Sequence, residues 1–282
     1  MFNLAAALLD PNLAAGRASR PAFRVRGATL SYSDVAHLAA RASNGLRARG
    51  VAPGDRVALV LPDSPAFVAT FLGALRIGAI AVTLSTYLSR DEYAYALDDC
   101  GARLTITDAA AGAALSAPAI EFTDLVAAKP DSVETHPTRA EDPAFIQYSS
   151  GTTGKPKGVV HLHRNGVQPA KLHGRHVSEI TDRDVVFSIP RQFFSFGLNN
   201  SLLVPLYYGA CAILEAERPS PDTKLNRRGH VTGHGPAKNT VKAEKPAPEP
   251  TAEAPSAEAS DAPAEASDAP AEETEAPAEE SA

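Results

Sequence analysis

A run of glycine, hydroxyl and lysine residues at positions 148–158 combines the residue types that bind polyphosphate. Glycine lets the backbone turn its N–H groups inward and lets a ligand approach closely, and consecutive N–H groups in such turns form an anion-binding concavity. Serine and threonine hydroxyls add neutral donors, and lysine adds charge that phosphate oxygens can share. We therefore predict a polyphosphate cradle whose binding residues are Ser149, Ser150, Gly151, Thr152, Thr153, Gly154, Lys155 and Lys157.

The flanking segments indicate that this cradle is a loop between two strands. Residues 144–148 and 159–162 are short apolar runs typical of strands. A Walker-type loop needs Ser or Thr after its lysine, whereas Lys155 is followed by Pro156, which has no N–H and disfavours an immediate helix start. Clusters of Gly, Ser, Thr and Pro are usually ordinary turns. That alternative stays open, although the paired lysines and doubled hydroxyls favour the cradle.

The other candidates for chemistry are histidine pairs, a serine nucleophile and a basic stretch. Histidines pair at 161 and 163, at 173 and 176, and at 230 and 234, but no Cys or carboxylate joins them at zinc-site spacing. Neither Ser149 nor Ser150 has the preceding glycine of a serine-hydrolase elbow. The basic stretch 223–242 lacks the interleaved aromatics of a nucleic-acid-binding segment. We predict no metal site and no nucleic-acid partner.

The composition changes sharply near position 222. Residues 1–222 carry 21 Lys and Arg against 21 Asp and Glu, and they hold every Phe and Tyr of the chain. Residues 223–282 carry 6 basic and 12 acidic residues, with few bulky aliphatic ones. Such a segment cannot bury enough apolar surface to offset its ordering entropy. We predict a folded domain over residues 1–222 and a disordered, low-complexity tail rich in Ala, Pro and Glu over residues 223–282.

The predicted tail ends in a seven-residue repeat. Pro263, Pro270 and Pro277 recur at one repeat position, and no apolar seam accompanies them, so the repeat is not a coiled coil. We expect an extended, solvated segment. It is either a solubilising appendage or an acidic interaction arm.

The first 222 residues alternate between strand and helix patterns. A helix is expected from Asp34 to about Arg49, with Ser33 as its N-cap. Further helices are expected at 64–77, 91–99 and 198–206, and strands at 56–61, 79–84, 103–107, 184–188 and 211–214. The alternation predicts an α/β fold in which helices flank a largely parallel sheet.

The cysteines and the N-terminal segment bear on the compartment. Cys100 and Cys211 are the only cysteines, which suits a reducing compartment and implies no disulfide framework. The apolar run at residues 4–9 ends at Asp10 and Pro11, and it is too short for a membrane span and lacks the basic residues of a signal peptide. We expect a short helix packed against the domain, no membrane partner and a cytoplasmic location. The sequence indicates no particular oligomeric state.

At the predicted cradle the chain resembles the adenylate-forming enzymes, which include acyl-CoA synthetases, luciferases and peptide-synthetase adenylation domains. Residues 148–158 are similar to that family's signature phosphate loop almost residue for residue. Residues 193–198 look like the aryl-binding helix of benzoate-CoA ligases. The likeness runs from about Asn3 to Asp222, with further ordered matches at residues 30–35, 53–58, 71–79, 205–206, 209–210 and 216–222.

The resemblance implies a ligase that joins an aryl or acyl carboxylic acid to coenzyme A, using ATP and Mg²⁺. It implies that the cradle holds the phosphates of ATP, and that Phe194, Phe196 and Gly197 line the slot for the small-molecule carboxylate. An apolar slot fits a planar ring. Clustered phenylalanines are also typical of a hydrophobic core, and this alternative stays open. No catalytic residue is assigned.

The resemblance covers only the N-terminal part of the family's large domain. We find no counterpart of the later Tyr-Gly-x-Thr-Glu element, the ribose-binding Asp, the hinge or the C-terminal catalytic Lys. We therefore expect a partial N-terminal domain of the adenylate-forming fold, arising from truncation, a frameshift or a fusion, and without ligase activity by itself. The alternatives are an inactive remnant that binds nucleotide weakly or not at all, and an interaction protein that acts through its acidic tail.

Overall fold

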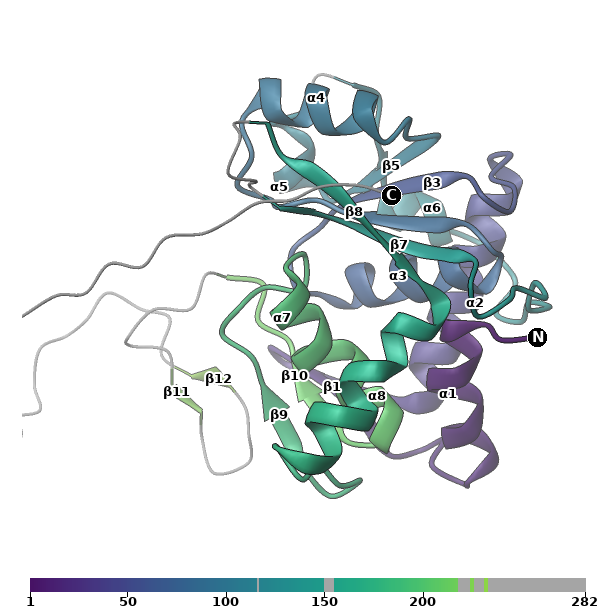
Figure 1. Cartoon of the computed structure of the whole chain (residues 1–282), viewed down its shortest axis with the longest axis vertical. Helices are drawn as coiled ribbons and strands as arrows, with labels where there is room; N and C mark the ends of the chain where they lie inside the picture. Colours follow the sequence, from purple (N-terminus) through teal and green to yellow (C-terminus); the bar gives the residue numbers. More distant parts are fainter. Residues whose placement is uncertain (116, 150–154, 218–223, 226–230, 233–282) are drawn as a thin grey trace, which may run out of the picture. The chain divides into compact units, whose positions relative to one another are not determined.

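The computed structural model describes residues 1–115, 117–149, 155–217, 224–225 and 231–232 (Figure 1). Residues 1–237 form one compact unit, and residues 238–282 are assigned to a second, of which no residue is described. The predicted tail therefore lies outside the described residues, except for β11 (Lys224–Leu225) and β12 (Val231–Thr232), which pair with each other in antiparallel orientation. Its disorder stays a prediction.

A six-stranded sheet contains most of the strands that the sequence predicts (Figure 1). The strand order is β6-β5-β3-β4-β7-β8, in which all neighbours are parallel except β7 and β8. The predicted α/β architecture, with helices flanking a largely parallel sheet, is confirmed. The strands are β3 (Arg56–Val60), β4 (Ile80–Thr83), β5 (Leu104–Thr107), β6 (Ile120–Glu121), β7 (Pro143–Ser149) and β8 (Lys157–Leu162).

Both faces of the central strands are covered by helices. The side chains of a strand alternate between its faces, so Val57 and Leu59 join the larger apolar cluster, while Ala58 and Val60 join the smaller one. The larger cluster includes residues of α2 (Tyr32–Ala48) and α3 (Pro65–Arg76), and the smaller one includes residues of α4 (Arg90–Asp99). Burial on both faces explains why the strands appear in the sequence as continuous apolar runs.

A second sheet joins the two ends of the folded sequence. It has four strands in the order β2-β1-β10-β9, and β1 lies parallel to β10 with Phe23 opposite Ala212. The sequence predicted β9 and β10 as strands, but it did not predict their pairing with an N-terminal hairpin. The strands are β1 (Pro21–Val25), β2 (Ala28–Ser31), β9 (Val185–Phe187) and β10 (Cys211–Ile213).

The start of α2 differs from the prediction, since its N-cap is Ser31 and not Ser33. The Ser31 hydroxyl accepts a hydrogen bond from the backbone N–H of Asp34 at 3.1 Å, and the Asp34 carboxylate accepts one from the backbone N–H of Ser31 at 2.8 Å. This reciprocal pair is a capping box, which needs an acid or amide three residues after the cap. From Ser33 that position is Ala36, which cannot close the box.

The predicted N-terminal helix is confirmed as α1 (Leu4–Ala14), but it continues past Pro11. Leu4 and Leu8 are fully buried, so the helix packs against the domain. The side-chain amide of Asn12 donates to the carbonyl of Leu8 at 2.8 Å and to the carbonyl of Leu206 at 2.7 Å. The second bond ties α1 to α8 (Val204–Tyr208).

The helix expected at 198–206 is longer than predicted. Three successive turns, namely α7 (Ser195–Leu198), the π-helical turn η3 (Asn199–Leu203) and α8, form one helical segment. The remaining short elements are α5 (Ala109–Gly112), α6 (Phe122–Val126), the 3₁₀ turn η1 (His163–Val167) and the π-helical turn η2 (Ala170–Gly174).

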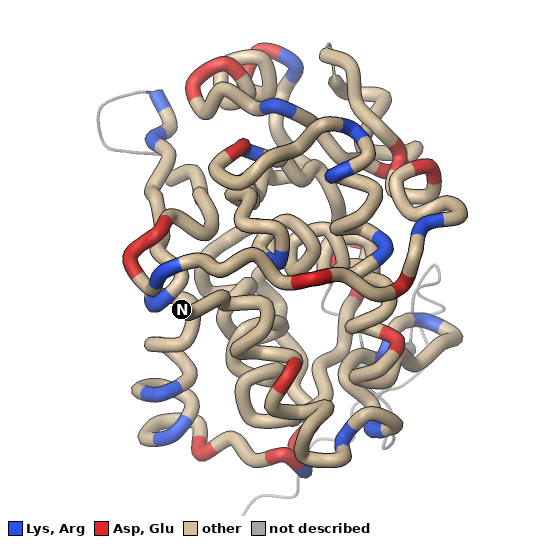
Figure 2. Tube along the Cα trace, turned by 90° about the vertical axis from the view of Figure 1, so that its right-hand side faces the viewer, with Lys and Arg blue, Asp and Glu red and all other residues tan. Residues whose placement is uncertain are grey.

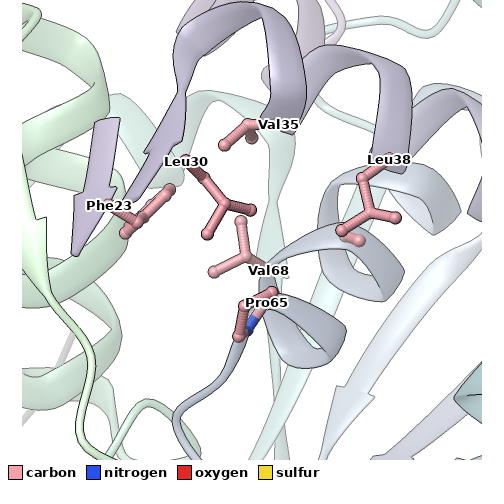
Figure 3. A pocket seen from close by; sticks show the side chains of 7 residues that line it. Phe23, Leu30, Val35, Leu38, Pro65 and Val68 are labelled. Carbon is pink, nitrogen blue, oxygen red and sulfur yellow. The ribbon is translucent and has the colours of Figure 1, made fainter. Parts of the chain in front are cut away.

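A small hollow between the second sheet, α2 and α3 lies within the hydrophobic packing of these elements (Figure 3). Its walls are entirely apolar, and it has no space for a water molecule. It therefore has neither the volume nor the polar groups of a ligand site. The lining residues are Phe23, Leu30, Val35, Leu38, Pro65, Val68 and Ala69.

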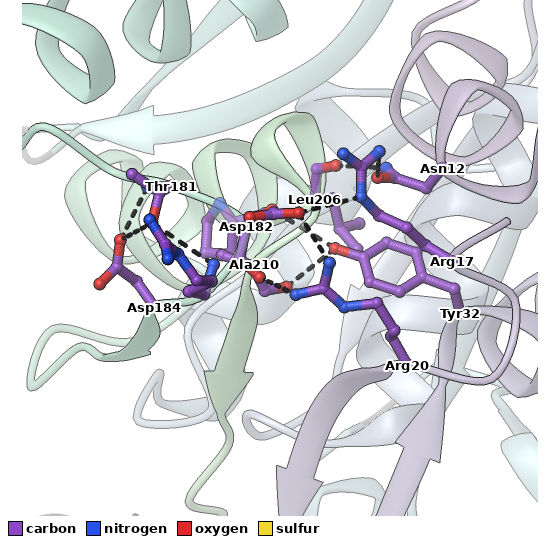
Figure 4. A network of polar contacts seen from close by, with 11 residues as sticks. Asn12, Arg17, Arg20, Tyr32, Thr181, Asp182, Asp184, Leu206 and Ala210 are labelled. Carbon is purple, nitrogen blue, oxygen red and sulfur yellow. Dashed lines mark hydrogen bonds and ion pairs between the residues drawn. The ribbon is translucent and has the colours of Figure 1, made fainter. Parts of the chain in front are cut away.

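A polar network around Tyr32 ties the N-terminal segment to the end of the folded sequence (Figure 4). The buried Tyr32 hydroxyl donates to the carbonyl of Ala210 at 2.8 Å, and burial raises the pKa of Tyr32 above its usual range. Nearby, the carboxylate of Asp182 lies 2.7 Å from the guanidinium of Arg20 and 3.5 Å from that of Arg17. These ion pairs are partly exposed, so the tyrosine hydrogen bond is the larger stabilising contact.

We expect Tyr32→Phe to lower the free energy of unfolding by about 1–2 kcal/mol, because it leaves a buried carbonyl without its donor. Urea unfolding of both proteins measures the change. Tyr207→Phe is the matched control, since no hydrogen bond from the Tyr207 hydroxyl is found within the described residues. Equal losses in the two variants would contradict the assignment.

Candidate nucleotide and acid site

The predicted cradle lies at the tip of an antiparallel hairpin formed by β7 and β8. Ser149 is paired with Lys157, and Tyr148 with Gly158. The two predicted flanking strands are therefore confirmed, and the described chain resumes as a strand and not as a helix. Residues 150–154 lie outside the described residues, so the hairpin places only Ser149, Lys155 and Lys157 of the predicted binding set.

The described end of the hairpin is open to solvent and positively charged. Ser149, Lys155 and Lys157 are exposed, and within the described residues neither lysine has an ion-pair partner. Gly158 packs closely, since a Cβ atom there would lie 3.1 Å from the side chain of Ile146 and 3.3 Å from the ring of Tyr148. Two unneutralised ammonium groups beside a hydroxyl fit a polyphosphate ligand.

A cavity of about 320 Å³ opens beside this hairpin. Its volume falls in the range of small-molecule sites. Ser149 and Pro156 contribute from the hairpin, and Phe194 contributes from the segment before α7, so the structure brings two of the predicted subsites together. The lining residues are Leu84, Ser85, Tyr87, Leu88, Glu92, Ala96, Tyr148, Ser149, Pro156, Phe193 and Phe194.

The three residues predicted for the aryl slot differ in their surroundings. Phe194 and Phe196 are 49% and 60% exposed, so neither is a core residue. Phe194 lines the cavity, whereas Phe196 does not. Gly197 is buried, and a Cβ atom there would overlap the backbone of Arg191. Close backbone packing therefore requires Gly197, and the role of Phe196 and Gly197 in a slot stays a prediction.

Sequence reasoning missed the side chains that hold the segment around Phe194. They come from the carboxyl ends of three adjacent parallel strands, β3, β4 and β7, where ligand sites of α/β sheets are usually found. The hydroxyl of Thr83 and the amide of Gln147 lie 3.3 Å and 3.4 Å from the carbonyl of Phe193. The Ser195 hydroxyl donates to the Gln147 amide oxygen at 2.7 Å.

Gln147 therefore links the two predicted subsites, because it lies two residues before Ser149 on the same strand. In the sequence, the one indication that Thr83 and Gln147 hold this segment is that they are polar residues within largely apolar strands.

The same segment is also held by a buried carboxylate that follows β3 in the chain. Asp63 accepts a hydrogen bond from the backbone N–H of Gln192 at 2.9 Å and lies 3.9 Å from the guanidinium of Arg191. Arg191 donates instead to the carbonyls of Glu215 and Ala216. Burial outweighs these contacts and raises the pKa of Asp63 to about 6. Asp63 is thus a structural anchor whose charge depends on pH.

The histidine pair at 161 and 163 has structural surroundings. The ring of His161 stacks on Phe145 with a centroid separation of 4.6 Å. His163 is fully buried, and its Nδ1 atom accepts a hydrogen bond from the backbone N–H of Leu4 at 3.0 Å. Burial lowers the pKa of His163 to about 4. Among the described residues no group of three or more His, Cys, Asp and Glu side chains is arranged to hold a metal ion.

Three further features concern the surface charges, the cysteine thiols and the search for a membrane-spanning helix. Basic and acidic residues are interspersed over the face that Figure 2 shows. Cys100 and Cys211 are both free. A search of the described helices for one with the length and apolar character of a membrane span gave none.

Comparison with known proteins assigns the chain to one family. The family model described as AMP-binding enzyme matches residues 12–235, most of the chain. The chain belongs to the AMP-binding enzyme family. The match passes residue 222, where the likeness was predicted to end.

Several curated relatives of this chain are named as ligases of aromatic acids. It is 34% identical to benzoate–CoA ligase of Thauera aromatica over 80% of this chain and 46% of the relative. It is 36% identical to 4-hydroxybenzoate–CoA/benzoate–CoA ligase of Rhodopseudomonas palustris over 79% of this chain and 44% of the relative. The recognition of an adenylate-forming, benzoate-CoA-ligase-like chain is confirmed.

Solved structures give the same answer. A benzoate CoA ligase from Burkholderia xenovorans LB400 superposes with a TM-score of 0.72 at 35% identity, over 78% of this chain and 46% of that one. An anthranilate CoA ligase in complex with anthranoyl-AMP gives a TM-score of 0.72 at 30% identity, over 77% and 45%. The AMP-binding chain therefore spans about half the length of the relatives it matches, and its fold is that of their N-terminal part.

Proposed function

We propose that this chain provides the ATP-phosphate and acid-facing part of an ATP-dependent aryl- or acyl-CoA ligase. The observation that carries the proposal is the cavity at the tip of the β7–β8 hairpin. Its wall includes Ser149 from the phosphate loop and Phe194 from the segment before α7. Two reacting groups held side by side need little further orientation, so a common cavity suits the transfer of a nucleotide to a carboxylate.

The reaction has two steps. The carboxylate oxygen attacks the α-phosphorus of ATP and releases pyrophosphate, and the thiol of coenzyme A then displaces AMP to form a thioester. Charge accumulates on the departing pyrophosphate, which lysine ammonium groups and backbone N–H groups stabilise. We assign this role to Ser149, Ser150, Gly151, Thr152, Thr153, Gly154, Lys155 and Lys157, and the carboxylate's ring or chain to Phe194, Phe196 and Gly197. Mg²⁺ accompanies the nucleotide, and no residue is assigned to it or to coenzyme A.

The length of the match supports a more limited function for this chain by itself. The matched relatives are about twice as long as the matched region, so we propose that residues 1–222 are part of an adenylation domain that binds nucleotide without completing the reaction. We propose that residues 223–282 are a disordered, solubilising or interacting tail.

We expect the chain to bind ATP, and we expect Lys157→Ala to weaken that binding about tenfold, which corresponds to the loss of one charge-assisted contact. Isothermal titration of ATP into each protein measures the dissociation constants. Lys171→Ala removes an exposed lysine outside the hairpin and is the control. A wild-type chain that binds no ATP, or equal affinities for wild type and Lys157→Ala, would contradict the proposed site.

A further inference from the structure

Helix α4 contacts both arms of the hairpin at the phosphate loop. We call Tyr148 and Ser149 the entering arm and Lys155, Pro156 and Lys157 the leaving arm. Tyr95 and Asp99 of α4 are four residues apart, so their side chains share one face of the helix. One face of α4 therefore contacts both arms of the hairpin.

The entering arm is held through the hydroxyl of Tyr148. This hydroxyl lies 2.6 Å from the carboxylate of Asp99 and 3.1 Å from the carbonyl of Ala96, both on α4. A hydroxyl has a single proton, and the shorter bond to the charged acceptor is the stronger one. Desolvation and this hydrogen bond raise the pKa of Tyr148, so the hydroxyl remains a donor.

The leaving arm is held twice by a single side chain. The hydroxyl of Tyr95 donates to the carbonyl of Pro156 at 3.1 Å. The ammonium of Lys155 lies 5.1 Å from the centroid of the Tyr95 ring, which is within the range of a cation–π interaction. The two contacts use different parts of Tyr95, so substitutions can separate them.

Tyr95 differs from its neighbour on the helix in a way that points to the loop. Tyr93 is 1% exposed and belongs to the apolar cluster beneath α4. Tyr95 is half-buried and belongs to neither of the two apolar clusters. A role in core packing does not explain its hydrogen bond to Pro156 or its ring contact with Lys155.

We propose that Tyr95 is a positioning residue for the polyphosphate site, and that it holds the Lys155 ammonium in a fixed place before the nucleotide binds. The inference rests on the proposed function for its ligand, a nucleotide polyphosphate. A free lysine side chain loses rotamer entropy when it is fixed by a ligand. Contact with the Tyr95 ring removes part of that loss in advance, and the bond to Pro156 fixes the backbone that carries the lysine.

The first test needs no ligand. Lysine side chains are acylated with a limiting amount of an N-hydroxysuccinimide ester, and mass spectrometry gives the labelling rate of Lys155 relative to Lys157 in the same molecule. Tyr95→Leu removes ring and hydroxyl, and we expect the ratio to rise about threefold, as for the loss of a weak cation–π contact. Tyr95→Phe keeps the ring, and its ratio is expected to stay close to that of the wild type.

Arg90→Gln, an exposed change on the same helix, is the control for effects on α4. If Tyr95 only stabilised the helix, Tyr95→Leu would raise the labelling of Lys155 and Lys157 together and lower the thermal midpoint. An unchanged ratio in Tyr95→Leu overturns the inference.

The second test uses ATP and inorganic tripolyphosphate. We expect Tyr95→Leu to bind ATP and tripolyphosphate about three- to tenfold more weakly than the wild type, because the ligand must then order the Lys155 side chain itself. The affinity of Tyr95→Phe should lie between those of Tyr95→Leu and the wild type. Equal affinities in wild type and Tyr95→Leu overturn the positioning role. A wild-type chain that binds neither ligand overturns the proposed function. In that case a raised labelling ratio in Tyr95→Leu would still show that Tyr95 holds Lys155.

Discussion

Purified by itself, the chain is expected to release no pyrophosphate from ATP in the presence of benzoate and to form no thioester with coenzyme A. The proposed site supplies contacts to the phosphates and to one side of the acid. Catalysis depends on interactions made in the transition state, and where several groups act as a unit, removing one of them can cost about as much activity as removing all of them. The relatives that catalyse such reactions are about twice as long as the matched region.

The measurement is a coupled pyrophosphate assay with ATP, Mg²⁺ and a series of aryl acids, run beside the ATP titration. Binding without turnover is the expected pattern. Benzoate-dependent release of pyrophosphate that disappears in Lys157→Ala would contradict it, and would mean that this chain is catalytically sufficient.

Exposed apolar residues lie on two edge strands, β8 and β9. Val159 and Val160 of β8 are 44% and 49% exposed, and Val185 of β9 is 43% exposed. Both strands lie at the edge of their sheets within the described residues. Edge strands with exposed apolar side chains tend to pair with strands of other molecules. A turnover assay should therefore also monitor self-association of the purified protein.

The sequence predicts those parts of the fold whose signal is local. Helix α3 begins one residue after the cap Ser64 and ends at Arg76, close to the predicted 64–77. The hairpin at the phosphate loop was predicted because Pro156 blocks a helix start and both flanks are apolar runs. The capping residue of α2 was mistaken because two serines compete, and only the partner three residues on distinguishes them.

The sequence does not predict contacts that depend on distant pairing. Nothing in residues 21–25 indicates that this segment lies beside residues 211–213, because register between remote strands carries no local pattern. The same holds for Tyr95, which reads as an ordinary helix residue until the fold places it beside Lys155. For the proposed acid-binding segment, sequence likeness pointed to Phe194, while the anchors of the segment, Asp63, Thr83 and Gln147, follow only from the sheet order.

Two buried groups are expected to give the stability opposite dependences on pH. Asp63 has its pKa raised from 3.8 to about 6, so the folded state binds its proton more tightly than the unfolded state. Its contribution is fully present below pH 3.8 and is lost as the pH rises through 6. His163 has its pKa lowered from 6.5 to about 4. Its contribution is fully present above pH 6.5 and is lost as the pH falls through 4.

Each shift corresponds to about 3 kcal/mol at 1.36 kcal/mol per pKa unit. The two windows overlap between about pH 4 and pH 6, so in the wild type the two contributions largely cancel there. On the histidine side the cause is burial of the imidazole, which the charge of Asp142 opposes. Protonation of Nδ1 would also remove the acceptor for the backbone N–H of Leu4. On the aspartate side the cause is the desolvation of a carboxylate that Arg191 contacts only at 3.9 Å.

Single variants should therefore separate the two slopes. Asp63→Asn lacks the stability that the wild type gains from Asp63 as the pH falls, so its free energy of unfolding, relative to that of the wild type, should fall by up to about 3 kcal/mol between pH 6.5 and pH 4. His163→Asn keeps an acceptor near Leu4 and lacks the stability that the wild type loses through His163 as the pH falls, so its free energy of unfolding relative to that of the wild type should rise over the same interval. Urea unfolding across this interval measures both, and subtracting the wild-type curve removes the contribution of the exposed carboxylates. Parallel curves for the two variants would show that Asp63 and His163 do not titrate in this range.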